Sequence, residues 1–189
     1  MTPKLILTGF MATGKSAVGH VVAARLGWEL IDTDAEIVRL AGKPIAQIFA
    51  DEGEARFRQI EREVIASIGR SHRRCPLCHG HYPAVVSTGG GALVDESNCA
   101  ALKRAGVVVC LTARAEVIAA RVERSHAKRP KLTEGSKPVL DRINELMAAR
   151  AEAYARADVC VDTSDISIAE AAERVIEGFN NYKRCNPSA

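Results

Sequence analysis

One segment near the start of the chain constrains its fold more than any other. Gly9-Phe-Met-Ala-Thr-Gly14-Lys15-Ser16 follows the apolar run Leu5-Ile6-Leu7 and leads into a helical pattern. It matches G-x-x-x-x-G-K-[ST] between a strand and a helix, the context in which this pattern forms a phosphate-binding loop. Glycine lets the backbone wrap tightly and turn its N–H groups inward. The sequence therefore predicts a cradle for the phosphates of a nucleoside triphosphate, built from Ala12, Thr13, Gly14, Lys15, Ser16 and Ala17.

Two side chains of this loop have expected roles. Lys15 would reach the β- and γ-phosphates, and the Ser16 hydroxyl would ligate Mg²⁺. An ordinary glycine-rich turn is the alternative, and the position at the first strand-to-helix junction disfavours it.

The alternation of patterns along the chain predicts an α/β fold. Short apolar or β-branched runs alternate with longer helical patterns, as in a parallel sheet with helices on both faces. No repeat or linker divides the chain, so we expect one domain over 1–180 and a tail over 181–189. The expected strands are 4–8, 29–31, 84–87, 107–111 and 159–161, and the expected helices are 15–26, 54–68, 97–104, 115–124, 138–156 and 167–179.

Composition limits the function classes. The 189 residues carry 26 Lys and Arg against 23 Asp and Glu, a net charge of +3 that is too mild to indicate nucleic acid as a partner. No apolar run reaches the length of a membrane span and no signal peptide is evident, so we expect a cytoplasmic protein. In that compartment the six cysteines would be core residues, metal ligands or free thiols, and Cys110 and Cys160 are expected to be buried.

Asp32 and Asp34 follow the second expected strand. If the strand continues through them, both carboxylates point to one face at the edge of the sheet that carries the triphosphate. One could serve Mg²⁺, and the other could deprotonate or orient a hydroxyl acceptor. Asp34 could also cap a helix that starts at Ala35, a role compatible with the first.

Three further groups carry candidate binding residues. Arg58 and Glu61 have i, i+3 spacing on a helix, where a surface ion pair is the default reading and recognition of a substrate carboxylate is the alternative. Gly89-Gly90-Gly91 ends a strand, so a ligand could approach the backbone there, although a flexible turn is possible. Arg129 lies in the basic stretch 125–137, which would suit a lid that neutralises charge on the transferred group; otherwise it is a solvated loop charge.

The chain resembles the shikimate kinase family. Gly-x4-Gly-Lys-Ser, Asp-x-Asp, Phe-Arg-x-x-Glu, Gly-Gly-Gly, Arg-Pro and Arg-x3-Tyr occur here in the family's order over nearly the whole chain. The resemblance implies a three-layer α/β/α P-loop kinase fold with a central, mostly five-stranded parallel sheet and a mobile lid over about 122–137. It also implies Mg²⁺-dependent transfer of the γ-phosphate of ATP to the 3-hydroxyl of shikimate, a step in chorismate and aromatic amino acid biosynthesis. We expect the protein to be a monomer.

The same resemblance implies a role for each matching residue. Lys15 would bind phosphate, Ser16 and Asp32 would serve the metal, and Asp34 would hold the reacting hydroxyl. Arg58, Arg150 and the backbone of Gly89, Gly90 and Gly91 would bind the shikimate carboxylate and hydroxyls, with Phe49 and Phe57 as apolar walls. Arg129 would be the lid arginine, and Arg121, or else Arg124, would pack on adenine.

The chain departs from the family pattern in the lid and in one insertion. Lys131 stands where the family commonly has leucine after Arg-Pro. The segment 72–83 looks like an insertion, and Cys75 and Cys78 with His72 or His81 could hold Zn²⁺. A solvated loop with incidental thiols is the competing interpretation, because zinc sites usually draw ligands from more distant segments.

Two other functions remain open from the sequence. A related kinase acting on gluconate would share the fold and the phosphate-binding loop, and a nucleotide-binding regulatory protein could use 72–83 as a sensor. The Asp-x-Asp pair together with Arg58, the glycine triple and Arg150 disfavours the gluconate kinase. Intact Asp34, Arg58 and Arg129 favour an enzyme with turnover over a protein that only binds nucleotide.

Overall fold

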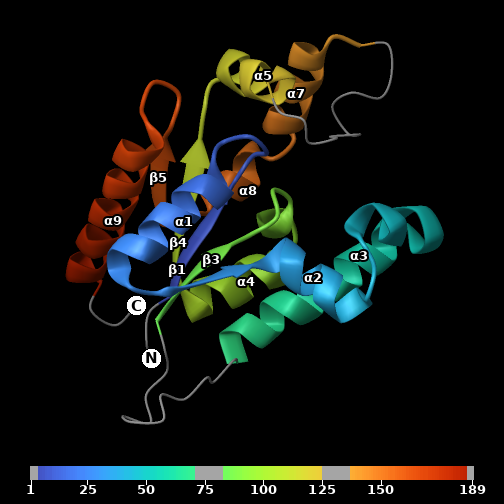
Figure 1. Cartoon of the computed structure of the whole chain (residues 1–189), viewed down its shortest axis with the longest axis horizontal. Coiled ribbons are helices and arrows are strands. Elements are labelled where there is room, and N and C mark those ends of the chain that lie inside the picture. The colour runs from blue at the N-terminus through green and yellow to red at the C-terminus, as the bar shows by residue number, and fades with distance from the viewer. Residues whose placement is uncertain (1–3, 71–82, 125–136, 187–189) are drawn as a thin grey trace.

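The computed structural model describes residues 4–70, 83–124 and 137–186. Within these residues, five parallel strands form one sheet in the order β2-β3-β1-β4-β5. Helices cover both faces, which confirms the predicted three-layer α/β/α architecture (Figure 1). The strands are β1 (Lys4–Gly9), β2 (Glu29–Asp32), β3 (Ala84–Ser87), β4 (Gly106–Thr112) and β5 (Val159–Asp162), each at a predicted run.

The strand order determines which loops meet. β1 lies at the centre of the sheet, with Leu5 in register with Val85 of β3 and with Val107 of β4. Because all the strands are parallel, the loops after β1, β2 and β3 leave from the same edge. A ligand site in an open α/β sheet lies at this carboxyl edge.

One face of the sheet is covered by α1 (Lys15–Leu26) and α9 (Ile168–Cys185). Leu7 of β1 packs in one buried cluster with Val22 of α1 and Val175 of α9. Trp28 meets Phe179 edge to face, with ring centroids 5.7 Å apart. These contacts fix α1, and therefore the loop that precedes it, against the sheet.

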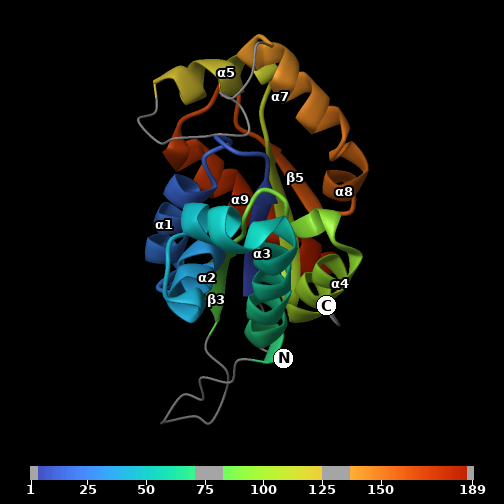
Figure 2. The same ribbon diagram turned by 90° about the vertical axis from the view of Figure 1, so that its right-hand side faces the viewer.

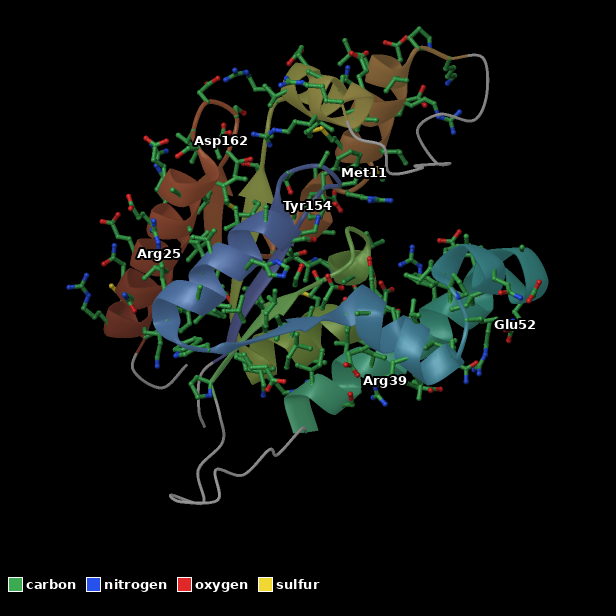
Figure 3. All side chains as sticks on the ribbon, viewed as in Figure 1. Met11, Arg25, Arg39, Glu52, Tyr154 and Asp162 are labelled. Carbon is green, nitrogen blue, oxygen red and sulfur yellow. The ribbon has the colours of Figure 1, made fainter. Side chains whose placement is uncertain are left out.

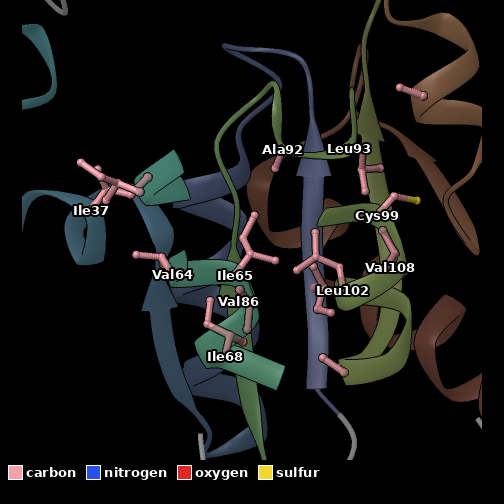
Figure 4. Packing of buried hydrophobic residues seen from close by; sticks show 14 of the residues in the cluster. Ile37, Val64, Ile65, Ile68, Val86, Ala92, Leu93, Cys99, Leu102 and Val108 are labelled. Atoms are coloured by element: carbon pink, nitrogen blue, oxygen red, sulfur yellow. The ribbon is translucent and has the colours of Figure 1, made fainter. Parts of the chain in front are cut away.

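The opposite face carries α3 (Ile45–Arg70), α4 (Glu96–Ala105) and the short α8 (Ala151–Ala155). Val86 and Val108 of the sheet pack against Ile65 of α3 and Leu102 of α4 (Figure 4). α2 (Thr33–Ala41) joins this cluster through Ile37, and a short 3-10 turn, η1 (Ala92–Val94), follows the glycine triple. The residues after β2 and β3 are thus attached to a well-packed layer.

A third cluster lies beyond the carboxyl edge of the sheet. α5 (Ala115–Glu123) and α7 (Val139–Ala148) pack on each other through Ile118 and Ile143, together with Phe10 of the phosphate-binding loop. Figure 2 shows both helices at the end of the molecule toward which the strands point. The lid predicted over about 122–137 falls largely outside the described residues.

The structure corrects several expected boundaries. The helix expected over 138–156 is divided into α7 and α8, because Arg150 has φ −115° and ψ 1°. The helix expected from Glu54 follows Gly53, whose non-helical φ 79° and ψ 176° separate it from an unexpected helical stretch that begins α3 at Ile45. α9 extends to Cys185, so part of the segment expected as a tail is helical.

Cys160 is also unlike its prediction. Cys110 is buried as expected, whereas Cys160 is exposed. β5 is the last strand of the order given above, and Cys160 lies on it next to Val161, whose side chain turns to the buried cluster under α9. In the part of the chain that the structure describes, no helix is long and apolar enough to cross a membrane.

Candidate active site

The loop between β1 and α1 has the backbone that the sequence pattern predicts. Gly9 has φ 130°, and a β-carbon there would lie 2.1 Å from the carbonyl oxygen of Leu111. Gly14 precedes α1 with φ 98°, and Ala12 adopts φ 62°, a left-handed conformation that costs a non-glycine residue about 1–2 kcal/mol. The chain therefore turns tightly and delivers the amino end of α1 to the cavity, where the helix dipole favours anions.

Lys15 begins α1 and lies back over this loop. Its Nζ donates hydrogen bonds to the carbonyl oxygens of Gly9, at 2.9 Å, and Phe10, at 2.8 Å. The side chain is therefore held along the loop that would surround a phosphate chain.

A cavity of about 370 Å³ opens at the carboxyl edge of β1, β2 and β3. It brings together the phosphate-binding loop, the two aspartates after β2 and part of the glycine triple, as the sequence predicts. Its lining residues are Met11, Ala12, Gly14, Lys15, Ser16, Ala17, Asp32, Asp34, Ser87, Thr88, Gly89 and Gly90.

The backbone around Asp32 and Asp34 differs from the expectation. β2 ends at Asp32 and α2 begins at Thr33, so the two carboxylates do not share a strand face. Asp32, and not Asp34, caps the helix, because its Oδ1 accepts from the N–H of Asp34 at 2.9 Å and of Ala35 at 3.3 Å. The turn nevertheless brings both carboxylates to the cavity.

The Asp34 carboxyl has an unusual environment. Burial and, after it, the neighbouring carboxylates Asp32 and Glu61 raise its pKa to about 6, while Lys15 and Arg58 oppose the shift. At neutral pH this group is ionised but holds a proton more readily than an ordinary aspartate. Such a carboxylate is suited to receive a proton from a hydroxyl.

Arg58 forms the predicted pair with Glu61. Its Nη1 donates to Glu61 Oε2 at 2.7 Å, and its Nη2 donates to Glu54 Oε1 at 2.9 Å. Glu61 is 1% exposed, so this pair is not the solvent-exposed pair that the default reading assumes. The guanidinium carbon lies 5.2 Å from the ring centroid of Phe57, which stacks on Phe49 at 4.8 Å. Arg58 is therefore held in one orientation by two carboxylates and a ring.

The glycine triple touches each of the other binding elements. A β-carbon on Gly91 would lie 3.0 Å from Nη1 of Arg58, and one on Gly90 would lie 3.3 Å from the Gly9 carbonyl oxygen. The Gly90 carbonyl accepts hydrogen bonds from Arg150 Nη1, at 3.2 Å, and from the Tyr154 hydroxyl, at 2.6 Å. Figure 3 shows Tyr154 beside the phosphate-binding loop that carries Met11. The triple is thus a close-packed meeting point and not a loose turn.

Arg121 projects from α5 toward the same loop. It donates to the carbonyl oxygens of Ala12, at 3.3 Å, and of Thr163, at 2.5 Å. Arg124 is exposed, and its Nε donates to the carbonyl oxygen of Ala120 in its own helix. Of the two arginines considered for the adenine, Arg121 therefore has contacts with the phosphate-binding loop.

The remaining predicted residues lie outside the described part of the chain. Arg129 and Lys131 of the lid, and the zinc candidates His72, Cys75, Cys78 and His81, are among them. Among the described residues, no group of three or more His, Cys, Asp or Glu side chains could hold a metal ion.

Sequence reasoning missed two buried threonines that join these segments. The Thr33 hydroxyl accepts a hydrogen bond from the N–H of Gly89 at 3.1 Å. The Thr163 hydroxyl lies 3.0 Å from the carbonyl oxygen of Thr13. Both residues stand at the carboxyl end of a strand, and that position is the signal that could have identified them.

The comparisons with known proteins agree with this geometry. The family model described as shikimate kinase matches residues 11–180. A shikimate kinase of Geobacter sulfurreducens is 42% identical over 171 residues, which cover 90% of this chain and 87% of that protein. One of Thermodesulfovibrio yellowstonii is 38% identical over 93% of this chain and 94% of its own length.

Solved structures show the same relation. Shikimate kinase from Acinetobacter baumannii in complex with shikimate superposes with a TM-score of 0.83 at 29% identity, covering 97% of this chain and 96% of that chain. A gluconokinase from Sinorhizobium meliloti has a TM-score of 0.58 at 20% identity, a likeness that shows the fold alone. From the family match, the identity of its relatives and the geometry of the cavity, the chain belongs to the shikimate kinase family.

Proposed function

We propose that this chain transfers the γ-phosphate of ATP to the 3-hydroxyl of shikimate, giving shikimate 3-phosphate and ADP on the way to chorismate and the aromatic amino acids. Its family membership supports an ATP-dependent kinase that acts on a hydroxyl group. The observation that carries the proposal is that Lys15, Asp34 and Gly89 line one and the same cavity, so that the phosphate-binding loop and the proposed acceptor carboxylate share it.

The phosphate side would be bound by the loop 12–17. Its inward N–H groups, the amino end of α1 and Lys15 would neutralise the triphosphate. Mg²⁺ fits the donors present, because the Ser16 hydroxyl and the Asp32 carboxylate supply hard oxygen ligands at this cavity. When bound, Mg²⁺ would neutralise charge on the β- and γ-phosphates. Ser16 would ligate it, and Asp32 would support it from the end of β2.

The acceptor side would be organised by Asp34. Its carboxylate would accept a hydrogen bond from the 3-hydroxyl and aim that oxygen at the γ-phosphorus. As the new oxygen–phosphorus bond forms and the bond to the β-phosphate oxygen breaks, the hydroxyl proton would pass to Asp34 and ADP would leave. The carboxyl pKa of about 6 is near the value that favours this exchange at neutral pH.

The shikimate carboxylate would be bound by Arg58 and Arg150. Both guanidinium groups lie against the glycine triple, one near Gly91 and the other on the Gly90 carbonyl. Arginine suits this task because its planar donors match a carboxylate. The backbone of Gly89, Gly90 and Gly91 would bind ring hydroxyls, and Phe49 and Phe57 would form an apolar wall.

Arg129 and Arg121 complete the proposed site. Arg129 would close over the phosphates from the lid and stabilise charge on the transferred group. Arg121 would pack on the adenine from its position beside Ala12, a contact that supports Arg121 over Arg124.

We further propose that the protein is a cytoplasmic monomer, and light scattering after size-exclusion chromatography would test its oligomeric state.

Zinc at Cys75 and Cys78 with His72 or His81 would be tested by elemental analysis of the purified chain. The matched control is the double variant Cys75→Ser with Cys78→Ser. One equivalent of zinc in the wild type and none in the control would support a zinc site, and no zinc in either would support the solvated loop with incidental thiols.

The test of the function is ADP release with ATP and Mg²⁺ in the presence of shikimate, gluconate or no acceptor. Release that depends on shikimate is the expected result, and Lys15→Met should abolish it. Release that depends on gluconate would assign a different small-molecule kinase. Binding of ATP by the folded chain with no release for any acceptor would support the regulatory alternative.

A further inference from the structure

Thr163 joins three segments that are far apart in the sequence. It follows β5 and is 3% exposed. Its hydroxyl lies 3.0 Å from the carbonyl oxygen of Thr13 in the phosphate-binding loop, and also 3.0 Å from that of Thr112 at the end of β4. Nη1 of Arg121, on α5, donates to the same hydroxyl at 3.1 Å.

Of the two carbonyl oxygens near the Thr163 hydroxyl, that of Thr13 is the better acceptor for the hydroxyl hydrogen. Thr112 already receives the N–H of Thr163 at 2.9 Å, so its carbonyl is satisfied without the side chain. A threonine hydroxyl has one hydrogen, and the donation from Arg121 occupies an acceptor position on its oxygen. The hydrogen is thus available for the Thr13 carbonyl.

That hydrogen bond has a consequence for the cavity. In a trans peptide the carbonyl and the following N–H point in opposite directions. When the Thr13 carbonyl is turned outward to Thr163, the N–H of Gly14 is turned inward, and Gly14 lines the cavity. Next to it, the Ala12 carbonyl is turned outward to Arg121.

The loop has a reason to need such a restraint. Ala12 has a left-handed backbone with φ 62°, and Gly14 has φ 98°. Strained conformations of this kind persist only when surrounding contacts determine them. Within the loop, the Thr13 hydroxyl donates to the Phe10 carbonyl at 2.8 Å, and the bonds from Thr163 and Arg121 come from outside the loop.

We propose that Thr163 is a positioning residue for the triphosphate: its hydroxyl fixes the Thr13 carbonyl and thereby aims the Gly14 N–H at the phosphates. The proposal deepens the proposed kinase function and rests on it. It assigns a role in phosphate binding to a residue outside the phosphate-binding loop. It also gives Arg121 a second task, as the donor that orients the Thr163 hydroxyl.

The test is the equilibrium binding of ADP and of inorganic tripolyphosphate, measured by calorimetry on the full chain. Thr163→Val keeps the shape and removes the hydroxyl, and should weaken both ligands about tenfold, the size expected for a lost buried hydrogen bond. Thr163→Ser should restore binding to within about twofold of the wild type. Thr112→Val is the matched control at the same sheet edge, because its hydroxyl donates to the Val161 carbonyl and not to the loop.

Each outcome bears on the proposal. Unchanged binding of both ligands by Thr163→Val would overturn it. Weaker ADP with unchanged tripolyphosphate would also overturn it, because the residue would then act on the nucleoside. If Thr163→Val does not fold, Thr163→Ala removes the same hydroxyl without added volume. The assay contains no acceptor, so a wrong shikimate assignment would not alter its result.

Discussion

A β-carbon on Gly89 would lie 2.9 Å from Oδ1 of Asp34, closer than such atoms approach in proteins. The glycine triple and the proposed acceptor carboxylate are therefore in contact, and a side chain at this position would displace the carboxylate. A β-carbon two residues later, on Gly91, would instead meet the guanidinium of Arg58, at 3.0 Å from Nη1. Gly89 thus lies against Asp34, and Gly91 lies against Arg58.

Alanine at each glycine should produce a different kinetic defect. Gly89→Ala should lower kcat by about tenfold or more, because small displacements of a reacting group are costly. Gly91→Ala should mainly raise KM for shikimate, because it shifts the flexible end of Arg58. Steady-state kinetics of both variants makes each the control of the other. Identical changes in kcat and KM for the two would contradict this division.

Asp34→Asn should lower kcat by about 10²- to 10⁴-fold, the usual contribution of a general base. Glu36→Gln, on the same helix, where Glu36 pairs with Arg39 outside the cavity lining, is the matched control and should retain activity. Because Asp34 has a pKa raised to about 6, kcat/KM of the wild type should fall as the pH drops through about 6. A flat pH profile between 5 and 8, or an active Asp34→Asn variant, would contradict the role.

The same carboxyl should make folding stability depend on pH. Its pKa is raised from 3.8 to about 6 by burial of the carboxyl group and then by the neighbouring carboxylates Asp32 and Glu61, so ionisation costs the folded state free energy relative to the unfolded chain. Asp34 borders an open cavity and is partly exposed, so solvent screens part of this cost. Relative to high pH, the folded state is therefore more stable below pH 3.8, where Asp34 is protonated, and this added stability is lost as the pH rises through about 6. Asp34→Asn should therefore unfold at a higher denaturant concentration than the wild type at pH 7.5, with a difference that shrinks toward pH 4. No difference at pH 7.5 would contradict the burial argument.

Arg58→Met should raise KM for shikimate by at least tenfold and change KM for ATP little, since the proposed site assigns this guanidinium to the shikimate carboxylate. Arg56→Met is the matched control on the same helix, where Arg56 pairs with the exposed Glu52. Glu61 would lose its 2.7 Å partner in Arg58→Met, so a melting curve should accompany the kinetics. A rise in KM for ATP with an unchanged KM for shikimate would contradict the proposed role of Arg58 in binding the shikimate carboxylate.

Exposed and buried cysteines should differ in how fast their thiols react with a reagent in solution. Cys160 and Cys185 are exposed, whereas Cys99 and Cys110 are buried, and burial raises the pKa of Cys110 to about 12. In the double variant Cys75→Ser with Cys78→Ser, a chromogenic disulfide reagent should therefore titrate two thiols rapidly in the folded state. Four should react after denaturation. Rapid reaction of Cys110 in the folded protein would contradict its position.

Much of the fold could be predicted because its signals are local. The apolar runs gave the five strands, and the loop pattern gave the start of α1 at Lys15. The break between α7 and α8 was not predicted because helix formers continue through Arg150, whose guanidinium donates a hydrogen bond to the distant Gly90 carbonyl. The exposure of Cys160 was not predicted because an apolar run does not reveal which strand lies at the edge of the sheet.

The site was predictable where a motif fixes the backbone, as at Lys15 and the glycine triple. The turn at Asp32 was not, because a strand and a capped helix start both accommodate the same Asp-x-Asp spacing. Thr33 and Thr163 escaped because their partners, Gly89 and Thr13, are distant in the sequence and meet only when the strands pair. Sequence patterns report neighbours along the chain, and these hydroxyls act across the sheet edge.

The most direct test of the central claim is NMR of the product formed from ATP and shikimate by the wild-type chain. The account predicts one phosphomonoester whose phosphorus couples to the proton on carbon 3 of shikimate, formed in equal amount with ADP. Lys15→Met, run alongside, should give neither. Phosphate on another hydroxyl, or inorganic phosphate with shikimate unchanged, would contradict the placement of Asp34 against the acceptor.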